Sequence, residues 1–124
     1  MKHGIITGIT AAEDIRPSIL PELSAQRKQM PIYSGVLMYF PGAIAELARH
    51  SFLANEKHNP GEELHWSRAK SADHLDCIAR HLMDAGGFDG DGLRHSTGMF
   101  WRAGANLQME LEAAGLYPIA PAAR

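Results

Sequence analysis

Apolar residues recur at spacings of three and four in three stretches of the chain, which is the period of an α-helix with one buried face. The first stretch covers residues 41–58 and begins at Pro41, because proline suits the first turn of a helix. Its apolar side consists of Ile44, Leu47, Ala48, Ser51 and Phe52. The Asn59-Pro60-Gly61 sequence ends the predicted helix.

The second and third stretches predict helices over residues 67–85 and 95–114, which end before Gly86 and Gly115. The second helix has an apolar arc that we expect to face the core: Ala72, Leu75, Ile78, Ala79, Leu82 and Met83. Its opposite arc is polar: Lys70, Asp73, His74, Asp76, Cys77, Arg80, His81 and Asp84. In the third helix, Met99, Ala103, Leu107, Leu111 and Ala114 form the apolar stripe.

The fold class predicted from these stretches is all-α, because nothing alternates convincingly with the period of two that marks a strand. Three helices with short connections indicate a helical bundle over residues 33–117. We expect oligomerisation to complete the bundle, since a chain of 124 residues buries little surface on its own. Residues 1–32, with three prolines, are predicted to be an N-terminal arm, and residues 118–124 a flexible tail.

Composition and charge limit the class of protein. The hydrophobic fraction of 45% is that of a globular domain, and a net charge of −2 does not indicate the basic surface of a duplex nucleic-acid binder. No apolar run approaches the roughly 18 residues that span a bilayer, and the first residues lack the core of a signal peptide. The single cysteine, Cys77, cannot form an internal disulfide. We therefore expect a cytoplasmic protein without a membrane partner.

The connection between the first two helices is the most unusual stretch in the chain. Residues 55–66, NEKHNPGEELHW, combine amide, acidic, basic and imidazole side chains with a rigid Pro-Gly corner and Trp66. A plain connector needs the glycine and the proline but not this chemistry. The alternative is a solvated loop that Trp66 anchors to the core, and the sequence leaves both interpretations open.

Asp73 and Asp76 of the second helix are three residues apart and therefore neighbours on its surface. Two such carboxylates suit a hard cation, which prefers oxygen ligands. Lys70 and Arg80 lie one turn to either side and would offset the charge of a polyphosphate. An ordinary solvated face with ion pairs explains the same residues.

Other chemistries find less support. The seven histidines include no HExxH motif and no cysteine-rich ligand set, so zinc is not indicated, and His81 is interpreted as a polar contact or hydrogen-bond donor. No oriented partner marks Cys77 as a catalytic thiol. The Asp89-Gly90-Asp91-Gly92 run lacks the spacing and final glutamate of a calcium loop and predicts a tight turn, although its carboxylates remain candidates for the site.

The run NEKHNPGEELHWSRAKSADHLDCIARHLMD, followed by FDGDGLRHS and WRAGANLQMELEAAG, resembles the phage dATP/dGTP diphosphohydrolase family, which is related to the MazG-like all-α nucleotide pyrophosphohydrolases. The resemblance covers residues 33–115. It implies a multimeric helical enzyme of the host-cell cytoplasm that uses Mg²⁺ or Mn²⁺. The expected reaction converts a purine deoxynucleoside triphosphate, dATP or dGTP, to the monophosphate and pyrophosphate.

The residues that match this family imply a site. The metal ligands would be Glu56, Asp73 and Asp76, and the catalytic residues Glu56, Lys70, Asp73, Arg80 and His81. The substrate-binding residues would be Asn55, His58, Trp66, Lys70 and Arg80. The chain departs from the wider superfamily, which carries Glu-x-x-Glu before Glu-x-x-Asp. Leu53 stands three residues before Glu56, and Arg49 three after Glu46, so the first pair is broken and Glu46 is only a candidate ligand.

Two alternatives to an enzyme remain. A small helical phage protein could bind a host partner through the polar arc of the second helix. It could also bind a nucleotide without turnover. Neither the base preference nor the number of metal ions follows from the sequence.

Overall fold

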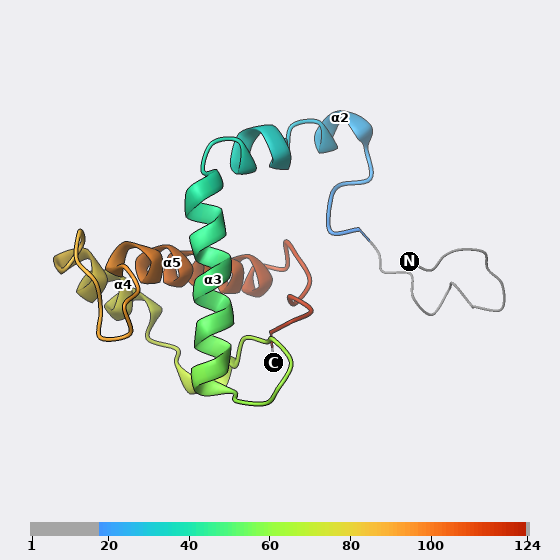
Figure 1. Ribbon diagram of the computed structural model, residues 1–124. Coiled ribbons are helices and arrows are strands. Elements are labelled where there is room, and N and C mark those ends of the chain that lie inside the picture. Colours follow the sequence, from blue (N-terminus) through green and yellow to red (C-terminus); the bar gives the residue numbers. More distant parts are fainter. Residues whose placement is uncertain (1–17, 124) are drawn as a thin grey trace, which may run out of the picture. The chain divides into compact units, whose positions relative to one another are not determined.

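A computed structural model describes residues 18–123 of the chain (Figure 1). The chain divides at Met30 into two units. In the first unit, the described residues form one short helix, α2 (Ser24–Arg27). The second unit begins at Pro31 and contains a π-helical turn, η1 (Tyr33–Leu37), the helices α3 (Pro41–His58), α4 (His74–Met83) and α5 (His95–Ala113), and a 3₁₀ turn, η2 (Arg68–Lys70).

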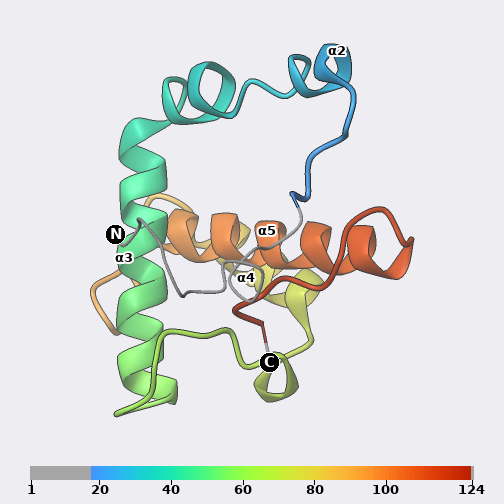
Figure 2. The same cartoon turned by 90° about the vertical axis from the view of Figure 1, so that its right-hand side faces the viewer.

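Helix α3 has the bounds that the sequence predicts. Pro41 occupies its first turn, and Asn59 is its C-cap residue, with the backbone N–H of Asn59 bonded to the carbonyl of Asn55. Gly61 follows with a φ of +80°, a conformation that favours glycine, so the chain turns away from the helix axis at this point. Figures 1 and 2 show α3 crossing α5 steeply, and the two helices are in contact.

Helix α5 also confirms its prediction. It ends in a glycine motif in which the N–H of Leu116 bonds to the carbonyl of Leu111 and the N–H of Gly115 to that of Glu112. Gly115 has a φ of +73°, which a side chain would oppose. The chain after this motif turns back, and the N–H of Trp66 bonds to the carbonyl of Ala122 at 2.8 Å.

The prediction for the second helix is wrong over its first third. Residues 68–70 form the 3₁₀ turn η2, Ser71 is extended, and α4 begins only at His74. The hydroxyl of Ser71 donates to Asp73 Oδ1 at 2.9 Å. Serine and aspartate make such local hydrogen bonds in competition with a helical backbone, which accounts for the late start. Asp73 is therefore the N-cap residue and Asp76 lies in the first turn.

The predicted orientation of this helix is also wrong for the single chain. Its main neighbour is α5, and two residues of the polar arc meet that helix: His74, which is 4% exposed, contacts Arg102, and His81 lies against Gly98. Ile78 of the apolar arc is half-buried, but Leu75, Leu82 and Met83 are exposed by 68, 61 and 86%. Polar ring side chains thus mediate the α4–α5 packing, and an apolar face is left without cover in one chain.

The all-α fold class is confirmed for the described residues, which contain no strand and only two isolated bridges, Trp66 with Ala123 and Phe88 with Arg94. Of the hydrophobic residues in this part of the chain, Leu93 and Ala105 alone are buried. None of the helices described is both long and apolar enough to cross a membrane.

Candidate functional site

A cavity of about 520 Å³ lies between the second half of α3, the α3–α4 connection, α5 and the C-terminal residues. Four residues predicted to bind substrate line it: Asn55, His58, Trp66 and Lys70. They share the cavity wall with residues not predicted for the site: His50, Asn59, Leu64, His65, Ser67, Ser71, Trp101 and Arg102. The structure therefore brings most of the predicted substrate-binding residues to one place.

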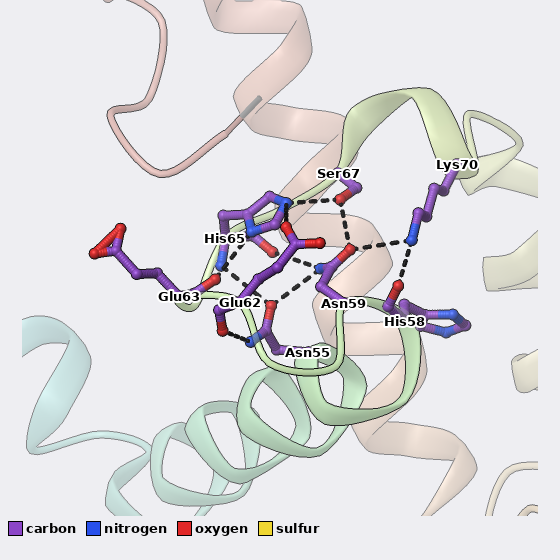
Figure 3. Close-up of polar contacts among 8 residues, drawn as sticks. All are labelled: Asn55, His58, Asn59, Glu62, Glu63, His65, Ser67 and Lys70. Carbon is purple, nitrogen blue, oxygen red and sulfur yellow. Dashed lines mark hydrogen bonds and ion pairs between the residues drawn. The ribbon is translucent and has the colours of Figure 1, made fainter.

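Two buried asparagines hold the α3–α4 connection in shape (Figure 3). Asn55 and Asn59 are one helical turn apart and are exposed by 7% and 5%. The Asn55 amide nitrogen donates to the carbonyl of Glu62, and its oxygen accepts from the Asn59 amide at 3.0 Å and from the N–H of His65 at 3.4 Å. The amide of Asn55 is thus occupied by the protein, so its role here is to position the loop.

Asn59 links this loop to Lys70. Its side-chain oxygen accepts from the Lys70 ammonium at 3.1 Å and lies 3.0 Å from the Ser67 hydroxyl, while the carbonyl of His58 is a second acceptor for Lys70. Ser67 also lies 3.0 Å from His65 Nε2, and His65 Nδ1 lies 2.9 Å from the carbonyl of Glu63. These contacts fix the Lys70 ammonium at the cavity wall through neutral acceptors (Figure 3).

Arg102 of α5 also lines the cavity. Its Nη1 donates to the Ser71 hydroxyl at 2.8 Å and to His74 Nδ1 at 3.1 Å. Burial, and then the charge of Arg102, lowers the pKa of His74. The neutral imidazole that results is the form whose Nδ1 accepts a hydrogen bond.

Aromatic rings form another part of the cavity wall. Trp66 and Trp101 meet edge to face with centroids 5.6 Å apart, and Arg68 covers the Trp66 ring at 4.3 Å. His50 lies 6.1 Å from Trp101, and its Nδ1 is buried without a hydrogen bond to a described residue. Burial lowers the pKa of His50. The wall thus offers aromatic surface beside two cations, and none of its described lining residues is a carboxylate.

The predicted metal ligands do not meet. Glu56 and Asp76 are exposed, and Asp73 accepts from Ser71 and pairs with Arg80 at 3.3 Å. Hydrogen bonds from Ser71 and Arg80 lower the pKa of Asp73 to about 2, so it is charged at neutral pH. Across residues 18–123, no three His, Cys, Asp or Glu side chains are grouped so that they could hold a metal ion. In one chain, the described residues therefore do not bring Glu56, Asp73 and Asp76 into a single group.

Arg80 and His81 also lie away from the cavity lining. His81 Nδ1 is 3.0 Å from His95 Nδ1, which joins α4 to α5. Gly98 makes room for this contact, because a Cβ there would lie 2.6 Å from His81 Nε2. Burial, followed by the charge of His95, lowers the pKa of His81. The structure gives His81 a helix-packing contact that matches its interpretation as a polar contact.

For some of the site residues that were not predicted, the sequence contains a pattern that could have indicated them. Asn59 follows Asn55 by four residues, which places both on one side of a helix. Arg102 is the one Lys or Arg between residues 95 and 123, in a stretch otherwise read as apolar packing surface. Ser71 and His74 carried none, because their roles depend on a residue about 30 positions further on.

Comparisons of the chain with family models, with curated proteins and with solved structures found no match. The cavity and its residues therefore carry the functional argument, and the resemblance to the phage diphosphohydrolases stays a prediction.

Proposed function

We propose that the chain binds a purine deoxynucleoside triphosphate, dATP or dGTP, and hydrolyses it to the monophosphate and pyrophosphate with Mg²⁺ or Mn²⁺ as cofactor. In this reaction water adds to the α-phosphorus and the bond from that phosphorus to the bridging oxygen of the β-phosphate breaks. The two products together retain all atoms of the nucleotide and of the water.

The observation that carries the proposal is the set of side chains that line the cavity. Trp66 and Trp101 provide aromatic surface for a base, while Lys70 and Arg102 provide positive charge for phosphates. A volume of about 520 Å³ lies within the range typical of small-ligand sites. These features support the nucleotide part of the proposal, whereas the metal part rests on the resemblance alone.

Binding without turnover is the second candidate. Two observations favour it: no described residue of the cavity lining is a carboxylate, and Asp73 is engaged by Arg80 and Ser71. A hydrolase of this kind needs a group that activates water or holds a metal beside the phosphates. A nucleotide-binding module needs only the aromatic and cationic wall.

A panel of the four dNTPs and four NTPs separates these candidates. Each nucleotide is incubated with the full chain and Mg²⁺ or Mn²⁺, and pyrophosphate and monophosphate are quantified. Release of both products from dATP or dGTP, abolished by EDTA, is the expected result. Binding of an α,β-non-hydrolysable dATP analogue without product from any nucleotide would support the binding module instead.

The proposed partner is a second copy of the chain. The open apolar face of α4, with Leu75, Leu82 and Met83, supports homo-oligomerisation, because large apolar groups in water favour association. A dimer or tetramer would cover this face, and it is the assembly that the resemblance implies.

A further inference from the structure

We infer that Arg102 and Lys70 form a cationic clamp for the phosphates of an anionic ligand, and that His74 is the positioning residue of Arg102. This assignment replaces Arg80 as the arginine of the site. It rests on the proposed function for a nucleoside triphosphate as the ligand, whereas the clamp itself takes any polyphosphate.

Lys70 and Arg102 donate to uncharged groups. Among the described residues, the acceptors of Lys70 are the carbonyl of His58 and the amide of Asn59, and those of Arg102 are Ser71 and His74. All four acceptors are neutral. Arg102 is half-buried, and a cation that is partly withdrawn from water is usually matched by a carboxylate. Among the described residues, the lining of the cavity that Arg102 and Lys70 share contains no carboxylate, so an anionic ligand would supply the missing countercharge.

Arg102 and Lys70 come to the cavity from different elements of the fold. Arg102 comes from α5 and Lys70 from the end of η2, and both line the same cavity. A guanidinium presents several N–H donors in one plane, and Nη1 is the nitrogen that Ser71 and His74 engage. The other donors of Arg102 make no hydrogen bond to a described residue, so the guanidinium retains donors for phosphate oxygens. Arg80, in contrast, is exposed and donates to Asp73 and Cys77.

The surroundings of His74 restrict the movement of its ring. It is 4% exposed, and Trp66 and Trp101 lie at centroid distances of 6.0 and 6.4 Å. Because these rings surround it, the imidazole has little freedom to turn, and Nδ1 remains directed at Arg102. Its Nε2 is buried without a hydrogen bond to a described residue, so the contact with Arg102 is the one hydrogen bond that the His74 ring makes within the described part of the chain.

Calorimetric titration of the full chain with inorganic tripolyphosphate, in EDTA, tests the clamp without turnover or base recognition. We expect wild-type binding, a loss of roughly 10- to 100-fold for Arg102→Gln and for Lys70→Gln, and little change for Arg94→Gln. Arg94 is a suitable control because it is exposed and covers Phe88 outside the cavity. Wild-type affinity in Arg102→Gln, or loss of binding in Arg80→Gln instead, would overturn the assignment.

His74 is tested by a conservative rescue. An asparagine places its side-chain oxygen near the position of Nδ1, so His74→Asn should keep most of the tripolyphosphate affinity, while His74→Phe should weaken it several-fold. A merely structural role would make the two variants differ in melting temperature and not in affinity. If His74→Phe does not fold, His74→Gln replaces it, because the glutamine amide lies nearer the position of Nε2 than that of Nδ1 and should not restore the affinity.

The two proposals can fail separately. Tripolyphosphate binding that depends on Arg102, with no hydrolysis of any nucleotide, would leave the clamp and refute the enzyme. Hydrolysis of dATP or dGTP at the wild-type rate by Arg102→Gln would leave the enzyme and refute the clamp. No binding of tripolyphosphate by the wild-type chain would also refute the clamp.

Discussion

Arg68 of η2 and Glu112 of α5 form a two-bond ion pair, with Nη1–Oε1 and Nη2–Oε2 distances of 2.6 and 2.8 Å. Gln108 and the backbone N–H of Ala120 donate to the same carboxylate. The guanidinium of Arg68 also lies over the ring of Trp66. One carboxylate therefore connects the α3–α4 connection, α5 and the C-terminal residues that enclose the cavity.

Glu112→Gln should destabilise the fold and disturb the cavity. The neutral glutamine amide cannot accept both hydrogen bonds that the Arg68 guanidinium donates. We therefore expect the melting temperature to fall by roughly 4–8 °C. Glu110→Gln is the matched control, because Glu110 is exposed and, among the described residues, its carboxylate accepts a single side-chain hydrogen bond, from Asn106. Thermal melts of both variants check this, and equal melting temperatures for Glu112→Gln and wild type would contradict it.

The Glu112 carboxylate also predicts that the fold loses stability in acid. Hydrogen bonds from Arg68 and then Gln108 lower the pKa of Glu112 from 4.5 to about 2. A carboxyl with a lowered folded-state pKa stabilises the fold above pH 4.5, and this contribution is lost as the pH falls from 4.5 through 2. Stability measured across that window should decline less steeply in Glu112→Gln than in wild type.

Gly98 and Gly104 provide a matched pair on α5. Alanine is favoured over glycine inside a helix by about 1 kcal/mol, and a Cβ at Gly104 meets nothing within 4 Å, so Gly104→Ala should stabilise by about that amount. A Cβ at Gly98 would lie 2.6 Å from His81, so Gly98→Ala should destabilise by about 1–3 kcal/mol despite the helix propensity. Denaturant unfolding measures both. A stabilised Gly98→Ala variant would show that His81 does not pack there.

Three histidines predict a loss of stability in mild acid. Burial is the leading cause that lowers the pKa of His50, His74 and His81 below 6.5. These histidines therefore bind protons more readily in the unfolded chain than in the folded chain. Their contribution to the stability of the fold is present above pH 6.5 and is lost as the pH falls through their folded-state pKa values. The melting temperature should drop between pH 7.5 and 5.5.

His50→Leu separates this effect from general acid sensitivity. It removes a titrating ring whose Nδ1 has no hydrogen bond to a described residue, so the drop between pH 7.5 and 5.5 should become smaller. An unchanged pH dependence would assign the effect to other groups.

Asp73→Asn and Asp76→Asn test the proposed metal site. If these carboxylates bind Mn²⁺, pyrophosphate release should collapse while the fold persists, because asparagine keeps the shape and removes the negative charge. Glu56→Gln should behave in the same way, and Glu46→Gln more mildly, since Glu46 pairs with Arg49. Pyrophosphate release is measured beside melts with and without Mn²⁺. Active variants that keep the normal Mn²⁺-induced rise in melting temperature would refute the site.

Leu82→Lys tests the assembly. A lysine in the open apolar face of α4 would place charge in the expected contact between copies, so light scattering should show a shift from oligomer to monomer. Asp84→Lys, beside this face but already polar, is the control for added positive charge. A wild-type chain that is monomeric and fully active at working concentration would contradict the prediction.

Local pattern in the sequence was sufficient for α3 and α5. Both have a long run with one period, and each ends at residues that favour a specific backbone conformation, such as Asn59-Pro60-Gly61 and Gly115. Such signals act within a few residues and do not depend on distant contacts. The all-α class follows from them, as does the expectation that Asn55, His58, Trp66 and Lys70 lie together.

Tertiary structure alone decided the start of α4, the side it presents to α5 and the second half of the cavity. Periodicity separates two faces of a helix but does not say which face a neighbour covers, and here Gly98 admits His81 where the apolar arc was expected. Arg102 meets Ser71 across 31 positions of sequence. Such a contact arises from the crossing of helices and connections in space, for which a single sequence carries no local signal.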